Sequence, residues 1–203
     1  MPNLLSRQLD KEGSIKLETI LKNKGLNLLV DKCVESIKGE NKVTNVVFKD
    51  GSLLEADMVI FSIGVRSNIQ IVKDTDIKTN RGILVDKYMN TSSKDIYACG
   101  DVAEIDSIVL AIWPASIDMG KIAGANACGD KLEFKIDNYP AGLDVFETKI
   151  FSIGNIKDNN GCISLNNNNN YKKLFFKDDL LVGAIFINDL SKNVKVMNLM
   201  SEN

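Results

Sequence analysis

The segment that most constrains the fold of this chain covers residues 91–101 and reads TSSKDIYACGD. Its apolar centre, residues 96–98, predicts a short buried strand that ends at Gly100 and Asp101. A carboxylate at the C-terminal end of a strand in an α/β sheet lies where such folds bind ligands. Ionised Asp only accepts hydrogen bonds, so Asp101 suits a ligand that offers hydroxyl groups. The Gly-Asp pair alone fits equally an Asp that begins an ordinary turn.

A second segment, residues 56–68 (ADMVIFSIGVRSN), has a similar layout. The apolar residues 58–63 predict a buried strand. Gly64 ends this strand and allows the backbone to approach a ligand closely. Taken alone, the pattern also fits an ordinary buried strand followed by a turn.

A third segment, residues 113–116 (WPAS), opens a helix that is predicted to run to about Cys128. Pro114 suits the first turn, because its missing N–H needs no partner there. The N-terminus of a helix stabilises partial negative charge on a ligand. Trp113 either flanks a bound ring or serves as a core or interface aromatic. Small residues give the helix a face for close packing: Gly120, Ala123, Gly124 and Ala127.

In their order along the chain, the three segments resemble motifs of the FAD-dependent pyridine nucleotide-disulfide oxidoreductase superfamily. Residues 91–101 are similar to its second flavin-binding motif, which reads Thr-Ser, a spacer, Ile-Tyr-Ala, any residue, Gly-Asp. Residues 56–68 are similar to its segment that ends Gly-Val-Arg-Pro-Asn, with Ser67 in place of Pro. The resemblance implies that Asp101 holds a ribitol hydroxyl of FAD. The cofactor-binding residues that it implies are Gly100, Asp101, Trp113 and Gly64.

The resemblance covers nearly the whole chain, from the LLSRQLD segment at residues 4–10 to the C-terminus. It is nearest to NADH:rubredoxin oxidoreductases and the flavin module of assimilatory nitrite reductases. It implies an α/β fold with the ends of an NAD(P)H-binding domain (1–68) and a Rossmann-like FAD-binding domain (69–130), then an α+β cap domain (131–203). The sequence has no Gly-x-Gly-x-x-Gly turn, which cradles dinucleotide phosphates in that family. The chain is therefore expected to correspond to the C-terminal half of a longer flavoprotein.

The activity that the resemblance implies is electron transfer from NAD(P)H through FAD to a small redox protein such as rubredoxin, or to an attached nitrite reductase centre. The cofactors carry this chemistry, and no side chain of the chain is a convincing acid, base or nucleophile. The alternative is a non-catalytic module, left from a truncated flavoprotein, that forms oligomers or binds a partner. The chain has no histidine, which excludes Ser-His-Asp catalysis and histidine-ligated metals within it.

Composition narrows the class of protein further. The formal net charge of -2 argues against an electrostatically driven nucleic-acid binder. No apolar run approaches the roughly 20 residues that a membrane span needs, and no signal-peptide pattern is present, so a cytoplasmic location is expected. The four cysteines form no Cys-x-x-Cys pair and are expected to be reduced and mostly buried. Cys99, beside the candidate flavin site, has either a packing role or a functional one.

The remaining patterns predict an amphipathic helix over residues 10–24 and a strand over 26–30. A small antiparallel meander is expected over residues 34–54, because Asp50-Gly51 is a strong hairpin signal. Further strands are expected at residues 82–86, 144–152, 171–176 and 180–187, with a turn at 177–179. The five consecutive Asn residues at 166–170 predict a solvated loop. Three lysines either steer an acidic partner or lie on a solvated strand edge: Lys172, Lys173 and Lys177.

Overall fold

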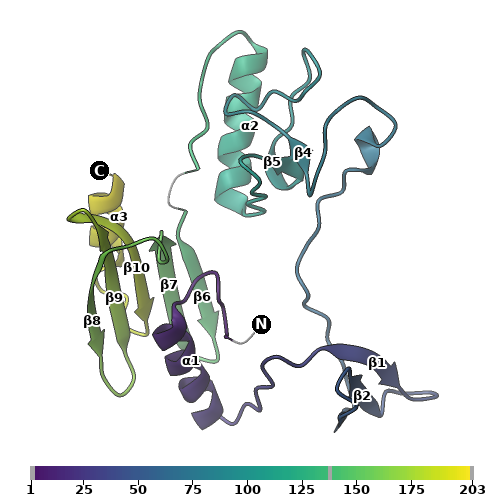
Figure 1. Ribbon diagram of the computed structural model, residues 1–203, viewed down its shortest axis with the longest axis vertical. Coiled ribbons are helices and arrows are strands. Elements are labelled where there is room, and N and C mark those ends of the chain that lie inside the picture. Colours follow the sequence, from purple (N-terminus) through teal and green to yellow (C-terminus); the bar gives the residue numbers. More distant parts are fainter. Residues whose placement is uncertain (1–2, 137–138, 202–203) are drawn as a thin grey trace. The chain divides into compact units, whose positions relative to one another are not determined.

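The computed structural model describes residues 3–136 and 139–201. The chain forms two compact units, shown in Figure 1. Unit 1 is discontinuous and combines Met1–Phe61 with Pro140–Asn203, whereas unit 2 is the intervening segment Ser62–Tyr139. Among the described helices, none has the length and apolar character required to cross a membrane.

The main element of unit 1 is a five-stranded antiparallel sheet with the order β6-β7-β10-β9-β8. Side chains of the central strand β10 alternate between its two faces. Ile185 and Ile187 pack with α1 (Lys11–Asn23) on one face, and Ala184 and Phe186 pack with α3 (Asn193–Ser201) on the other. The strands are β6 (Ala141–Val145), β7 (Thr148–Gly154), β8 (Gly161–Asn166), β9 (Tyr171–Lys177) and β10 (Leu180–Ile187).

Helix α1 confirms the helix predicted near the N-terminus. It begins after Asp10, whose carboxylate accepts a hydrogen bond from the Gly13 N–H at 2.9 Å and so satisfies a free donor of the first turn. The strand predicted over residues 26–30 is absent, so this prediction is wrong. Leu26 and Leu28 instead pack against the core on the α1 face of the sheet, and this segment joins none of the described sheets.

The predicted meander is confirmed as a three-stranded antiparallel sheet of β1 (Val34–Lys38), β2 (Asn45–Phe48) and β3 (Leu53–Glu55). Gly51 has a φ of 81°, which the hairpin between β2 and β3 requires. The predicted turn between β9 and β10 is also confirmed, since Asp178 and Asp179 both have positive φ.

Other C-terminal predictions need correction. The strand expected over residues 144–152 is interrupted by a tight turn at Phe146 and Glu147, where φ is 47° and 57°, so it becomes the β6–β7 hairpin. Strand β8 and helix α3 were not predicted. The Asn run provides the loop between β8 and β9, as expected.

Unit 2 is built around α2 (Trp113–Ala127), the helix that the WPAS segment predicts. Its buried residues Ala115, Met119 and Ala123 pack with Met89 and other apolar residues to form the core of the unit. Two short strands, β4 (Ile83–Leu84) and β5 (Ala103–Glu104), pair in parallel. Single turns of 3-10 helix lie at η1 (Gln70–Val72) and η2 (Gly100–Val102).

The strands predicted around the Gly-Asp motif are shorter than expected. The strand over residues 82–86 is reduced to the two residues of β4. Residues 96–98 form no strand: Tyr97 makes one isolated bridge with Asn90, and Ile96 is exposed. A parallel sheet of two short strands offers few partners for these segments, and hydrogen-bonded neighbours are what extend a strand.

The prediction of a buried strand at residues 58–63 is wrong. We call residues 58–65 the apolar run. No strand is assigned there, and its large apolar side chains are strongly exposed: Met58 76%, Ile60 82%, Phe61 67%, Ile63 89% and Val65 79%. A strand needs ladder partners and a covering layer, and the described residues provide neither for this segment.

The burial expected for the cysteines and the edge position expected for the lysines also need correction. All four cysteines are free and exposed rather than buried: Cys33, Cys99, Cys128 and Cys162. Of the two alternatives for the three lysines of β9, the strand edge is wrong, because β9 has neighbours on both sides. The steering of an acidic partner stays a prediction. Each lysine has a carboxylate partner: Asp189 for Lys172, Asp10 and Glu12 for Lys173, and Asp158 for Lys177.

Candidate functional site

The Gly-Asp turn of unit 2 depends on a glycine for conformational reasons. Gly100 has a φ of +75°, in the left-handed region that L side chains rarely adopt. A Cβ at this position would lie 3.7 Å from the side chain of Ser116, which is ordinary contact. The backbone conformation, rather than crowding, therefore requires the glycine, and it places Asp101 on an exposed turn.

The carboxylate of Asp101 is oriented by helix α2. Ser116, in the first turn of α2, donates its hydroxyl hydrogen to Oδ1 of Asp101 at 2.7 Å. Among the described residues, Oδ2 of Asp101 accepts no hydrogen bond. A carboxylate held in this way retains acceptor capacity for ligand hydroxyl groups. Sequence reasoning did not find Ser116, because no pattern indicated that the helix would contact the turn.

Ser67 brings two of the sequence motifs together. Its hydroxyl donates to the backbone carbonyl oxygen of Asp101 at 2.7 Å. Proline, which the family pattern has at this position, lacks a hydroxyl and could not make this bond. Gly64, three residues earlier, is exposed and has a φ of +88°. The segment that contains Gly64 is thus anchored to the turn that carries Asp101.

Trp113 lies at the exposed start of α2. Its side chain is 80% exposed, so it does not fill the core of unit 2. Ile112 occupies the N-cap position and gives no side-chain hydrogen bond to the helix. The first turn of α2 therefore keeps N–H groups that no cap satisfies. The roles of Trp113 beside a ring or at an interface both stay predictions.

A buried carboxylate, Glu104 of β5, holds the loop next to the Gly-Asp turn. Glu104 is 1% exposed and accepts hydrogen bonds from Asn80 Nδ2 at 2.8 Å, Arg81 N at 2.7 Å and Gly82 N at 2.8 Å. Burial alone would raise the pKa of Glu104, but these hydrogen bonds outweigh it and lower the pKa below its usual value. The ionised carboxylate is thus part of the fold of unit 2, and sequence reasoning missed it.

A cavity of about 540 Å³ lies along residues 67–79 of unit 2. Ser67, which contacts the Asp101 turn, is one of its lining residues. Gly64, Gly100, Asp101 and Trp113 do not line it, so this cavity is not the candidate flavin site.

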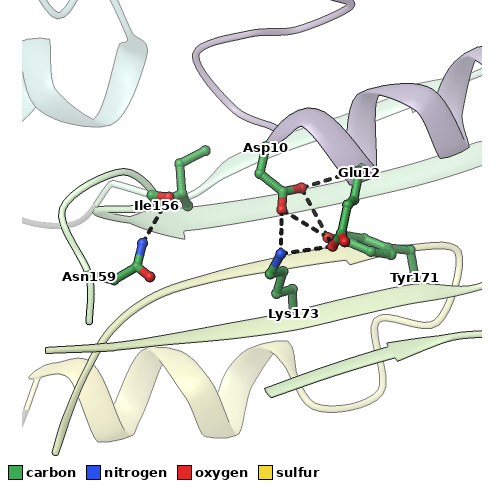
Figure 2. Close-up of polar contacts among 7 residues, drawn as sticks. Asp10, Glu12, Ile156, Asn159, Tyr171 and Lys173 are labelled. Atoms are coloured by element: carbon green, nitrogen blue, oxygen red, sulfur yellow. Dashed lines mark hydrogen bonds and ion pairs between the residues drawn. The ribbon is translucent and has the colours of Figure 1, made fainter. Parts of the chain in front are cut away.

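Figure 2 shows the charged cluster of unit 1, which Asp10, Glu12, Tyr171 and Lys173 form. Lys173 of β9 contacts Asp10 and Glu12 at the start of α1, each at 2.8 Å, and the Tyr171 hydroxyl lies 3.0 Å from Asp10. Hydrogen bonding to Lys173 lowers the pKa of Glu12. Burial and the two carboxylates raise the pKa of Tyr171, so it stays protonated. These groups provide one another with hydrogen-bond and ion-pair partners, and they hold α1 against the sheet.

Comparisons with known proteins divide the chain into two parts. Residues 1–120 match the family described as pyridine nucleotide-disulphide oxidoreductase. Residues 141–203 match the rubredoxin NAD+ reductase C-terminal domain. The fold class expected from the sequence, mixed α/β followed by a small sheet domain, is confirmed.

Two curated relatives match almost the whole chain. The assimilatory nitrate reductase electron transfer subunit of Bacillus subtilis is 33% identical over 200 residues, which cover 96% of this chain and 26% of that protein. The NADH-rubredoxin oxidoreductase of Clostridium acetobutylicum is 31% identical over 194 residues, covering 95% of this chain and 48% of that protein. The chain thus spans about half or less of the length of these relatives.

Solved structures agree with these matches. The crystal structure of NADH:rubredoxin oxidoreductase from Clostridium acetobutylicum has a TM-score of 0.72 at 30% identity, covering 100% of this chain and 51% of that one. An NAD-dependent persulfide reductase from A. fulgidus, with a TM-score of 0.86 and 21% identity over 100% of this chain and 43% of its own, shares the fold. Because the family pattern covers residues 1–120 of 203, this chain belongs to the pyridine nucleotide-disulphide oxidoreductase family, whose members use FAD and NAD(P)H.

Proposed function

We propose that this chain supplies the ribityl-facing side of an FAD site in an enzyme that passes electrons from NAD(P)H through FAD to a small redox protein such as rubredoxin, or to a nitrite reductase centre. The observation that carries this proposal is the geometry of Asp101. Its carboxylate lies on an exposed turn, is oriented by Ser116, and keeps one oxygen open among the described residues. The names of the relatives supply the acceptor classes.

The residues of this chain fit one part of the flavin cofactor better than another. Asp101 is an acceptor for the hydroxyl groups of a ribityl chain, and Gly100 places no side chain next to it. No Gly-x-Gly-x-x-Gly turn is present for the pyrophosphate. FAD, when bound, supplies the redox chemistry, accepting two electrons from the nicotinamide and releasing them singly. The chain thus contributes to a site that further residues complete.

Each candidate residue has a defined task in this proposal. Asp101 binds a ribityl hydroxyl, and Ser116 orients the carboxylate for it. The N-terminus of α2, which has no side-chain cap, stabilises negative charge at the pyrimidine edge of the flavin ring. Trp113 lies beside this edge of the ring. Gly64 lines the nicotinamide side, and Ser67 fixes its segment to the Asp101 turn. None of these groups transfers a proton.

The completing residues would come from a polypeptide equivalent to the remaining half of the relatives. The exposed apolar run supports this part of the proposal, because Ile60 and Ile63 are more than four-fifths exposed. An apolar patch of this kind marks a surface that another protein segment covers. A cytoplasmic location, expected from the sequence, stays a prediction.

The test begins with the absorption spectrum of the purified chain after it is mixed with FAD and desalted. The measurement is repeated with the N-terminal half of the Clostridium acetobutylicum relative added. We expect weak retention of flavin by the chain alone, a stable yellow complex with the added half, and bleaching of that complex by NADH. No retained flavin in either sample would contradict the proposal.

The role of Asp101 is tested by Asp101→Ala in the yellow complex. Loss of a hydrogen bond to a charged acceptor costs about 1.5–3 kcal/mol, so FAD should bind about 10- to 100-fold more weakly. The matched control is Asp130→Asn, because Asp130 is an exposed carboxylate of the same unit. Equal flavin affinity of Asp101→Ala and the unchanged chain would remove Asp101 from the site.

The alternative function is a non-catalytic module that forms homo-oligomers or binds a partner, and the exposed apolar run also favours it. This alternative predicts a stable oligomer whose mass does not respond to FAD or NADH. Light scattering with and without FAD separates the two functions. A monomer that takes up flavin with the added half excludes the alternative.

A further inference from the structure

Unit 1 contains an apolar groove on the α3 face of its sheet. The groove has a volume of about 380 Å³ and lies between strands β8–β10 and helix α3. The volume is in the range of small-ligand sites, which are mostly apolar with a few polar groups that fix orientation. The apolar lining includes Ile163, Leu174, Phe176, Leu181, Val196 and Leu199.

The strand register defines the two ends of the groove. Lys172 pairs with Phe186 of β10 and with Leu165 of β8, which defines one end. Phe176 pairs with Leu181, four residues further along β9, which defines the other end. These two ends are about 13 Å apart, since a strand rises about 3.3 Å per residue.

Helix α3 places two more lysines at the Lys172 end. Lys192 and Lys195 lie before and within the first turn of α3, and both line the groove. The last turn of α3 lies at the opposite end, because Met200 packs against Gly154, which pairs with Gly183. The groove therefore has one cationic end and one end that is apolar throughout.

The lysine end carries a surplus of positive charge. Lys172 is paired with Asp189 at 2.6 Å and lies over the Phe186 ring. Lys192 and Lys195 are exposed, and within residues 3–136 and 139–201 neither has an ion-pair partner. Two cations thus remain available to a ligand at this end of the groove.

We propose that this groove binds a single-chain amphiphile with a carboxylate head group. The apolar tail lies along Leu174 and Phe176, and the carboxylate lies between Lys192 and Lys195. An anionic head is specified by the two available ammonium groups, and an apolar tail by the lining of the remaining groove. Residues of the flavin proposal take no part in this site, so either proposal can fail without the other.

A small amphiphile accounts for the groove better than a peptide does. A helical peptide would need a row of anchor pockets several turns long, whereas this groove spans about 13 Å between its two ends. The charge also lies at one end rather than along both rims, as a single head group requires.

The test is isothermal titration of the 203-residue chain with decanoate below its micelle concentration, with 1-decanol and acetate as matched probes. We expect saturable binding of one decanoate per chain, weaker binding of decanol, and none of acetate. In Lys192→Gln/Lys195→Gln, decanoate binding should weaken about fivefold, and its salt dependence should decrease. Ile163→Glu, a change at an exposed position on the rim, should weaken it at least as much through repulsion.

The control variant is Lys11→Gln, because α1 packs on the opposite face of the sheet. Circular dichroism verifies that each variant keeps its fold. Absence of saturable decanoate binding would overturn the proposal, as would equal binding of decanoate and decanol. The proposal would also be overturned if decanoate failed to bind while Lys192→Gln/Lys195→Gln weakened binding of an acidic protein such as rubredoxin, since the groove would then be a protein-docking surface.

Discussion

Two apolar segments of similar composition adopt different structures in this molecule. Strand β10 (LLVGAIFI) lies at the centre of a five-stranded sheet, with Ile185 fully buried. The apolar run (MVIFSIGV) forms no strand, and its Ile63 is 89% exposed. The difference lies in what surrounds each segment. Strand β10 has β7 and β9 on its edges and helices on both faces, whereas the apolar run has neither among the described residues. Apolar sequence therefore specifies a strand only where partners are present.

The largest expected effect tests this contrast directly. Ile185→Ala should destabilise the sheet by about 2–5 kcal/mol, because it leaves a cavity in a close-packed core. Ile63→Ala should change stability by less than about 0.5 kcal/mol, because its side chain is exposed. Hydrogen exchange of the β10 amides measures the effect of Ile185→Ala, and exchange of the amides of unit 2, which contains Ile63, measures the effect of Ile63→Ala. A comparable loss in Ile63→Ala would mean that the apolar run is buried in solution, and light scattering would then show self-association.

A second prediction concerns the ion pairs that join helix α1 to strand β9, the neighbour of β10. Lys173→Met removes the cation between Asp10 and Glu12 and should cost about 2 kcal/mol, because it leaves a largely buried carboxylate without its charged partner. Lys177→Met breaks the exposed pair with Asp158 on the same strand and should cost less than about 0.5 kcal/mol. Urea unfolding followed by far-UV circular dichroism compares the two. Equal losses would show that the cluster in Figure 2 does not fix α1 to the sheet.

Unit 2, which begins within the apolar run at Ser62, depends on polar contacts more than on strand pairing. Glu104→Gln should destabilise it by about 2 kcal/mol, because the amide offers N–H groups where the carboxylate accepts from three donors. The pKa of Glu104 is lowered in the folded state. Its contribution is therefore complete above the unfolded pKa of about 4.3 and is lost as pH falls through the lower folded pKa. Thermal unfolding between pH 3 and 7, followed by far-UV circular dichroism, should show a weaker acid dependence in Glu104→Gln. An identical pH profile would contradict this assignment.

The smallest predicted effect concerns the anchor just after the apolar run. Ser67→Ala should cost about 1 kcal/mol of local stability, because it removes the bond to the Asp101 carbonyl. Ser67→Pro, which restores the residue of the family pattern, should lose the same bond. The control is Ser62→Ala, an exposed serine of the same unit. Exchange rates of amides in the Asp101 turn report the change, and unchanged rates in Ser67→Ala would show that the bond does not order the turn.

The sequence predicted an element correctly where the signal for it lies within the element itself. Helix α1 follows from its apolar spacing, and the turns at Gly51 and Asp178 follow from turn chemistry. The strand at residues 58–63 failed because pairing partners are not encoded in the segment itself. In the candidate site, Gly100 and Asp101 came from a motif. The contacts of Ser116, Ser67 and the buried Glu104 join residues that are 15 to 34 positions apart, so no local pattern indicates them.

The discontinuity of unit 1 has a consequence for the order of folding during translation. Lys173 and Asp10 are 163 positions apart, yet their contact joins α1 to the sheet. Helix α1 leaves the ribosome before β9 and β10, so its buried Leu17 and Leu21 have no core to enter until these strands have been synthesised. Unit 2 is complete as soon as Tyr139 has emerged. The middle of the chain can therefore fold before its beginning does, and the nascent helix needs protection from aggregation during the interval.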